Sequence, residues 1–135
     1  MRYLVIMAAA LVVAAGTALA AGIEVIDGDT IRRDGVTIRI MGLDAPEVRG
    51  KCPDERAKAN RATARLRELV EAGVTITPQQ RRTRDGVIVE ARDRYGRVLA
   101  TVRDARGRDV ADVLVNEGLA RRYDGHGQRG GWCPL

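Results

Sequence analysis

The sequence predicts an α+β fold that is mainly β: a five-stranded Greek-key barrel of the OB-fold type with two helices packed against it. Three observations predict this class. Short apolar alternations recur between turn residues, as half-buried strands require. Two other segments repeat apolar residues at helical spacing, and no linker or composition shift divides residues 21–135. Short strands that close on themselves with helices outside favour a Greek-key barrel, of which the OB fold is the commonest.

Six short segments have the composition of strands. We expect them at residues 23–26, 30–32, 36–40, 74–77, 87–89 and 98–102. Asp34-Gly35 is a strong hairpin signal between the second and third of these. In residues 36–40 the alternation places Ile38 on one face of the strand and Arg39 on the other. Residues 81–84 are expected to form a basic turn, and Asp85-Gly86 to begin a second hairpin.

Two segments have the signals of helices. Pro53 suits a first helical position, apolar residues then recur at helical spacing, and Gly73 ends the pattern. Asp109 is a suitable N-cap for a second helix, with Gly118 as its terminator. Beyond Tyr123 the chain is rich in glycine and is expected to be a loop. Both helices are expected to pack outside the strands.

The N-terminal segment has the pattern of an export signal. Arg2 precedes an apolar stretch, and Ala18-Leu19-Ala20 offers small residues where a signal peptidase cleaves. We therefore expect a signal peptide at residues 1–20 and a secreted or periplasmic domain at residues 21–135. An uncleaved membrane anchor is the alternative, because the apolar run approaches the length that spans a bilayer.

Charge and cysteine content narrow the possible partners and compartment. The formal net charge is +5, which favours polyanionic partners such as nucleic acids. Cys52 and Cys133 are the two cysteines, and in an oxidising compartment they are expected to pair, with two free thiols as the alternative. A zinc site is not supported, because His126 is the single histidine and has no second ligand near it in the sequence.

Two acidic clusters are candidates for metal binding. Asp27-Gly28-Asp29 alone is usually turn chemistry, and acidic residues beside a proline, as in Asp44-Ala45-Pro46-Glu47, are usually solvated. Both clusters nevertheless sit at the ends of adjoining expected strands, so Asp29 and Asp44 could converge on one hard cation. Calcium accepts carboxylates, carbonyls and water together. Glu47 would then stand near enough to orient a water molecule beside the cation.

Two arginines are candidates for binding phosphate. A phosphodiester under attack gains negative charge on its oxygens, and fixed guanidinium groups stabilise that charge. Arg39 lies on the strand that leads to Asp44, and Arg97 precedes a later strand. The alternative for each is a solvated strand residue, which is a strong alternative in a chain so rich in arginine.

Four segments together form a specific pattern. They are Ile-Asp-Gly-Asp-Thr at residues 26–30, Arg-Ile-Met-Gly-Leu-Asp-Ala-Pro-Glu at 39–47, Asp-Arg-Tyr-Gly-Arg-Val-Leu-Ala at 93–100 and Val-Asn-Glu-Gly-Leu-Ala at 115–120. In content and order they resemble the signature blocks of the staphylococcal nuclease, or thermonuclease-like, family. The resemblance covers roughly residues 23–123.

The resemblance implies an OB-fold barrel with packed helices and calcium-dependent cleavage of DNA and RNA, by water attack that breaks the bond to the 5′ oxygen. By motif position, Asp29 and Asp44 would bind calcium through their carboxylates, and Ala45 through its carbonyl. Glu47 would be the general base. Arg39 and Arg97 would bind the phosphate.

The chain also departs from the best-known members of that family. Ala45 stands where they carry threonine, the segment at residues 77–92 is longer, and the long C-terminal helix is absent from this sequence. We hypothesise that a Cys52–Cys133 link substitutes for that helix. For base stacking, Tyr95 and Tyr123 are the candidates, and Tyr123 could instead close the core; Arg94 could hold a terminal phosphate.

Two other functions are compatible with parts of the pattern. One is an OB-fold module that binds single-stranded nucleic acid without cutting it. Such a module has no use for Glu47 beside a pair of metal ligands. The other is an envelope protein that uses calcium only for stability, which has no use for Arg39 and Arg97 in one cleft. The enzyme is the preferred interpretation, as a monomer that needs no stable protein partner and no membrane after signal cleavage.

Overall fold

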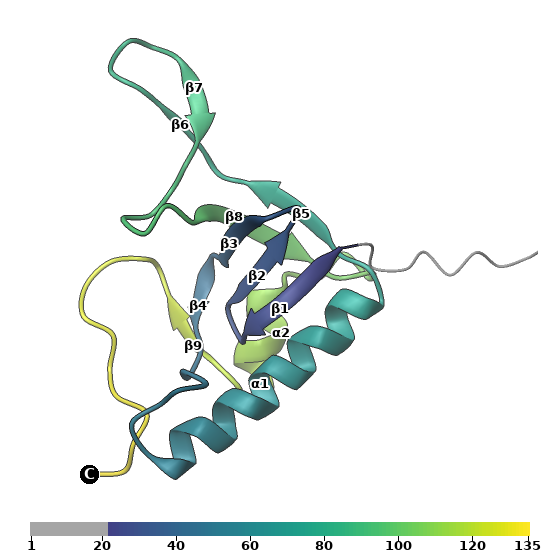
Figure 1. Cartoon of the computed structure of the whole chain (residues 1–135), viewed down its shortest axis with the longest axis vertical. Coiled ribbons are helices and arrows are strands. Elements are labelled where there is room, and N and C mark those ends of the chain that lie inside the picture. The colour runs from purple at the N-terminus through teal and green to yellow at the C-terminus, as the bar shows by residue number, and fades with distance from the viewer. Residues whose placement is uncertain (1–21) are drawn as a thin grey trace, which may run out of the picture.

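The computed structural model describes residues 22–135; the expected signal peptide at residues 1–20 lies outside this range. Nine strands and two helices follow one another along the described chain (Figure 1). They are β1 (Ile23–Asp27), β2 (Thr30–Arg33), β3 (Val36–Ile40), β4 (Gly42–Asp44), α1 (Pro53–Glu71), β5 (Thr75–Pro78), β6 (Gln80–Arg82), β7 (Ile88–Glu90), β8 (Val98–Arg103), α2 (Val110–Asn116) and β9 (Arg121–Tyr123).

Five strands form the central sheet in the order β1-β2-β3-β8-β5. Neighbours pair antiparallel except β3 and β8, which run parallel. The turn between β2 and β3 has positive φ at both Asp34 (49°) and Gly35 (79°), which confirms the expected hairpin. The five strands of the central sheet, together with the two helices, agree with an OB-fold-like domain.

The expected closed barrel is not seen. Within residues 22–135, the edge strands β1 and β5 are not hydrogen-bonded to each other, so the sheet is open. A shift of register between Val25 and Asp27 interrupts β1, and such an irregularity bends an edge strand. Helix α1 packs along β1 and covers that side of the sheet (Figure 1).

Strands β6 and β7 form a separate hairpin that projects from the sheet (Figure 1). Arg81 and Arg82 lie within β6, where they pair with β7, so the expectation of a turn over residues 81–84 was wrong at its first half. The chain reverses instead between Thr83 and Val87, with Gly86 at φ +84°. Cross-strand hydrogen bonds therefore outweigh the turn tendency of the charged run.

The two helices and the sheet enclose one apolar core. Helix α1 starts at Pro53, as expected, and buries Ala59, Ala62, Leu66, Leu69 and Val70. Asp109 caps α2 by accepting a hydrogen bond from the backbone N–H of Ala111 at 2.9 Å. The same core includes Ile31, Ile40, Leu43 and Leu114, which are almost completely buried. Among the described residues, no helix combines the length and apolar character needed to cross a bilayer.

A disulfide closes the C-terminal end of the fold. Cys52 and Cys133 are joined, with their Cα atoms 5.9 Å apart, and Cys52 is the residue before α1. The tail, residues 124–135, therefore folds back past β4 and ends beside the first turn of α1 (Figure 1). This arrangement brings the tail to the acidic residues at the end of β4.

Candidate active site

Asp29 stands at the entrance to β2 and is buried, with 5% of its surface exposed. Its Oδ1 accepts a hydrogen bond from the Thr30 hydroxyl at 2.9 Å, and its Oδ2 accepts one from the backbone N–H of Ala45 at 3.0 Å. The guanidinium of Arg39 is 3.3 Å from the same Oδ2. These contacts tie the two sequence-distant acidic clusters together, as the sequence predicted.

Arg39 is buried rather than solvated. Its Nη1 donates to the carbonyl of Ile40 at 2.8 Å, and its Nη2 donates to the carbonyl of Leu43 at 3.0 Å. Because backbone carbonyls and Asp29 all hold it, the guanidinium has a fixed direction. The alternative of an ordinary solvated strand residue is excluded for this arginine.

Asp44 ends β4 and is paired with two arginines of the C-terminal region. Its Oδ2 accepts a hydrogen bond from Arg121 and its Oδ1 one from Arg129, both at 3.1 Å. The carboxylate itself is buried. Sequence reasoning missed both arginines, and for Arg129 the reason is that the glycine-rich segment around it carries no periodicity that could place it. The expected disulfide was the one signal that the tail returns to this region.

Glu47 lies on the loop after β4, and 58% of its side chain is exposed. Partial burial and the charge of Asp29 raise the pKa of its carboxyl, although Arg129 acts in the opposite direction. Beneath the loop, the buried Glu55 accepts a hydrogen bond from the backbone N–H of Lys51 at 2.8 Å. A β-carbon on Gly50 would lie 2.4 Å from Glu55 Cγ, so this loop needs a glycine there. The loop that presents Glu47 is thus seated on α1.

The acidic residues suit a hard cation. Burial, together with repulsion from Asp29, raises the pKa of Asp27 to about 7. Buried carboxylates beside a backbone carbonyl are the oxygen ligands that calcium prefers. Within residues 22–135, however, Asp29 and Asp44 are not joined by a third carboxylate in one tight cluster. The donor set therefore fits an open cation site with few protein ligands.

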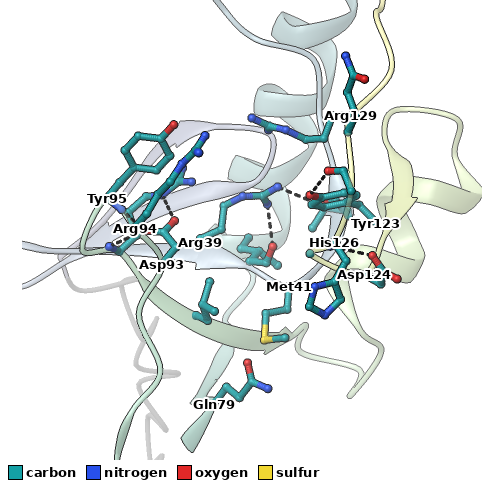
Figure 2. A pocket seen from close by; sticks show the side chains of 18 residues that line it. Arg39, Met41, Gln79, Asp93, Arg94, Tyr95, Tyr123, Asp124, His126 and Arg129 are labelled. Atoms are coloured by element: carbon teal, nitrogen blue, oxygen red, sulfur yellow. Dashed lines mark hydrogen bonds and ion pairs between the residues drawn. The ribbon is translucent and has the colours of Figure 1, made fainter. Parts of the chain in front are cut away.

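A groove of about 740 Å³ adjoins this acidic cluster, and Arg39, Arg94, Arg97 and Arg129 are among its lining residues. We refer to it as the arginine groove. Figure 2 shows Arg39 between Arg94 and Tyr95 on one side and Tyr123, Asp124 and His126 on the other. Asp29, Asp44 and Glu47 do not line the groove, so Arg39 and Arg129 connect the acidic cluster to it.

Arg97 also lines the arginine groove, where its guanidinium lies 5.4 Å from the centre of the Tyr95 ring. Its Nε donates to Asp93 Oδ2 at 2.7 Å, and its backbone N–H donates to Asp93 Oδ1 at 3.0 Å. Burial would raise the pKa of Asp93, but the hydrogen bonds from Arg97 and from Tyr95 lower it overall. The structure therefore places Arg39 and Arg97 in one groove, with Arg97 held by its own carboxylate rather than by the acidic cluster.

The three predicted substrate-binding residues also line the groove. Tyr95 is 66% exposed, and the guanidinium of Arg94 lies 4.9 Å from its ring centre. Tyr123, the last residue of β9, donates from its hydroxyl to the carbonyl of Gly127 at 3.1 Å. Tyr95 is therefore exposed at the groove with the guanidinium groups of Arg94 and Arg97 over its ring, whereas the Tyr123 hydroxyl supports the start of the tail.

A comparison with known protein families identifies one family, and its match includes several of the residues described above. A family model described as "Staphylococcal nuclease homologue" matches residues 37–131. The match includes Arg39, Asp44, Glu47 and Arg97, whereas Asp29 precedes it and is linked to it by the contact with Arg39. The resemblance noted in the sequence blocks is confirmed.

Two curated relatives share about a third of their aligned residues with this chain. The chain is 35% identical over 97 residues to "Succinoglycan biosynthesis protein ExoI" of Rhizobium meliloti (strain 1021), covering 72% of this chain and 48% of that protein. It is 32% identical over 106 residues to an "Uncharacterized endonuclease" of Escherichia coli, covering 76% of this chain and 59% of that protein. The chain thus spans about half the length of the curated relatives it matches.

Proposed function

Because the chain belongs to the staphylococcal nuclease homologue family, we propose that it is a calcium-dependent nuclease that hydrolyses phosphodiester bonds of DNA or RNA. One observation carries the proposal most directly. The buried carboxylate of Asp29 pairs with a buried and rigidly held Arg39, which also donates to the carbonyl of Leu43, the residue before the buried Asp44, and which lines a groove with further arginines. A protein that only needed a charged surface would not bury these groups.

Calcium would be held by the carboxylates of Asp29 and Asp44 and by the carbonyl of Ala45, which we refer to as the cation site. When bound, calcium supplies positive charge that polarises a phosphoryl oxygen and stabilises the transition state. Two features support this set: the Ala45 N–H donates to Asp29, and Asp44 directly precedes Ala45. A site with so few protein ligands leaves positions for water and for the substrate.

Glu47 is the proposed general base. It is the half-exposed carboxylate beside the cation site, and the raised pKa of its side chain suits it to take a proton from water. Arg39 would stabilise the charge that develops on the phosphate. Arg97, whose Nε donates to Asp93 at 2.7 Å, lines the arginine groove with Arg39 and would add a second guanidinium with preset direction.

The arginine groove is the proposed site for the nucleic acid strand. Its arginines match a phosphate backbone, and the exposed Tyr95 ring offers a face on which a base can stack. Arg94, beside that ring, would contact a phosphate at the end of the bound segment. Tyr123 would define the opposite wall of the groove (Figure 2).

We also propose export to the periplasm or the outside of the cell, as a monomer. The signal pattern at residues 1–20 and the disulfide between Cys52 and Cys133 both favour an oxidising compartment. Disulfide bonds that persist are rare in the cytosol. The test is to fuse the whole chain to a reporter protein and measure how much of the fusion is exported. Ala18→Arg alters the expected cleavage site and should block release of the mature protein.

The decisive experiment is digestion of single-stranded DNA by the purified protein in calcium and in chelator. Glu47→Gln should reduce turnover by roughly 10²–10⁴ while leaving the fold intact. Glu71→Gln is the matched control, because Glu71 is exposed at the far end of α1. If the protein bound DNA tightly but did not cleave it in any divalent ion, the proposal of a nuclease would be wrong, and a nucleic-acid-binding module would be the better interpretation.

A further inference from the structure

The C-terminal tail presents one cation, Arg129, to the acidic cluster, and the proposed cation site and general base give it no role there. The Nη1 of Arg129 donates to Asp44 Oδ1 at 3.1 Å and lies 4.0 Å from Glu47 Oε1. Asp44 is a proposed calcium ligand, and Glu47 is the proposed base. One guanidinium therefore contacts or approaches both groups on which the reaction depends.

The tail is anchored on both sides of Arg129. On the C-terminal side, Cys133 is bonded to Cys52, and the Trp132 ring lies 3.7 Å from the guanidinium of Arg121. Arg121 also donates to the carbonyls of Gly130 and Gly131. On the N-terminal side, the Tyr123 hydroxyl donates to Gly127. These contacts keep residue 129 within reach of the acidic cluster.

Arg129 differs from the other guanidinium on Asp44. Arg121 is fixed by two backbone carbonyls and an aromatic ring, so it serves as an anchor of the tail. For Arg129, the contacts found among the described residues are those with Asp44 and Glu47, and 42% of its side chain is exposed at the groove. The side chain of Arg129 is therefore the one that can leave Asp44 without disturbing the tail.

We propose that Arg129 is an internal counter-ion of the cation site, which neutralises Asp44 in the absence of a divalent ion and must give up Asp44 when calcium binds. The inference rests on the proposed function, since it takes Asp44 to be a calcium ligand. Both positive groups need the same carboxylate oxygens, so each weakens the binding of the other. The tail thereby sets the affinity of the enzyme for its metal.

The test is a calcium titration of the ion-free protein without nucleic acid, by calorimetry. Arg129→Gln should bind calcium about 3- to 10-fold more tightly than the natural protein, the range expected when a competing, partly exposed and hydrogen-bonded charge is removed. Arg129→Lys keeps the charge and should stay closer to the natural affinity. Arg122→Gln is the matched control, because Arg122 lies in β9 but pairs with Asp112 on α2.

Trp132 provides a second readout that does not depend on activity. It is the single tryptophan of the chain and stacks on Arg121, which itself donates to Asp44. Calcium on Asp44 should therefore change the tryptophan emission, with a midpoint that matches calorimetry in each variant. A midpoint shifted to lower calcium in Arg129→Gln supports the competition.

The disulfide gives a further test of how Arg129 is delivered. Replacing both cysteines by serine should raise calcium affinity when Arg129 is present and should have little additional effect in Arg129→Gln, because both changes remove the same competitor. Urea unfolding of each variant shows whether the domain remains folded. If replacing the cysteines raised calcium affinity equally in the natural protein and in Arg129→Gln, the tail would not be what positions Arg129 at Asp44.

The outcomes separate this inference from the proposed function. Equal or weaker calcium binding by Arg129→Gln, with calcium-dependent cleavage retained, overturns the counter-ion and leaves the nuclease intact. Failure of every variant to bind calcium overturns the cation site, and the counter-ion with it. Tighter binding by Arg129→Gln alone, with Arg122→Gln unchanged, supports both.

Discussion

Removal of the Cys52–Cys133 disulfide should destabilise the protein severely. The two cysteines are 81 residues apart, so the bond closes most of the domain into one loop. In the chain-entropy relation, a loop of this length corresponds to about 4.5 kcal/mol of unfolding free energy at 25 °C, within the measured range of roughly 2–5 kcal/mol. Such a loss is a large share of the stability of a typical small domain.

The expected change in melting temperature follows from the size of the domain. Near 100 residues, 1 kcal/mol corresponds to about 4 °C, so loss of 2–4.5 kcal/mol should lower the melting temperature by about 8–18 °C. The assay compares thermal melts of the natural protein and the Cys52→Ser/Cys133→Ser variant, each with and without reductant. Reductant should lower the melting temperature of the natural protein and leave that of the variant unchanged.

An unchanged melting temperature in the variant would refute the reasoning. It would mean that the tail contacts contribute nothing to folding and that the hypothesis of a substitute for the missing C-terminal helix is wrong. A lower melting temperature accompanied by native far-ultraviolet circular dichroism at 25 °C would show that the bond stabilises the folded domain without being needed to form it.

Three further predictions concern the groove and the turn that precedes it. Gly28→Ala should cost about 1–3 kcal/mol by overpacking, measured by urea unfolding, because the added β-carbon would lie 2.8 Å from Ala45 Cβ and 2.9 Å from Ala62 Cβ. Arg97→Lys should lower cleavage of DNA by at least about tenfold, measured as kcat/KM, since the planar fork is lost; near-normal cleavage would remove Arg97 from the mechanism. Because the pKa of Asp93 is lowered in the folded state, its ion pair stabilises the protein above the ordinary pKa of 3.8 and is lost as pH falls through the lowered value. The difference in unfolding free energy between the natural protein and Asp93→Asn should therefore shrink from pH 6 to pH 3, and a constant difference would contradict the pairing.

The sequence predicted local features of the site well because turn and alternation signals act over a few residues. Asp34-Gly35 gave the first hairpin, and the alternation around Arg39 placed that side chain on the face opposite Ile38. Asp29 meets the Ala45 backbone because Asp29 directly precedes β2, and the neighbouring strand β3 leads on through β4 to Ala45. In each case a short-range rule fixes the position of the functional group.

Features that depend on contacts between distant parts of the chain were harder to predict from the sequence. Arg81 was expected in a turn, yet it lies in β6, because the register of a hairpin depends on pairing with a partner strand. The open edges β1 and β5 follow from the pairing of strands that are far apart in the sequence, which no local pattern specifies. Arg129 reaches Asp44 through a tail whose path is set by the disulfide, since the sequence around it has no periodicity of its own.

The two halves of the site differ in what holds them, and this difference bears on how activity and stability are linked. Asp29 and Arg39 are fixed by backbone hydrogen bonds within the sheet, so their geometry should persist as long as the core is folded. Asp44 is instead held by Arg121 of β9 and by Arg129 of the tail. Changes to the tail should therefore alter cation binding before they alter the phosphate-binding arginines. A site fixed by the core on one side and adjusted by a cross-linked tail on the other can change its metal affinity without repacking the core.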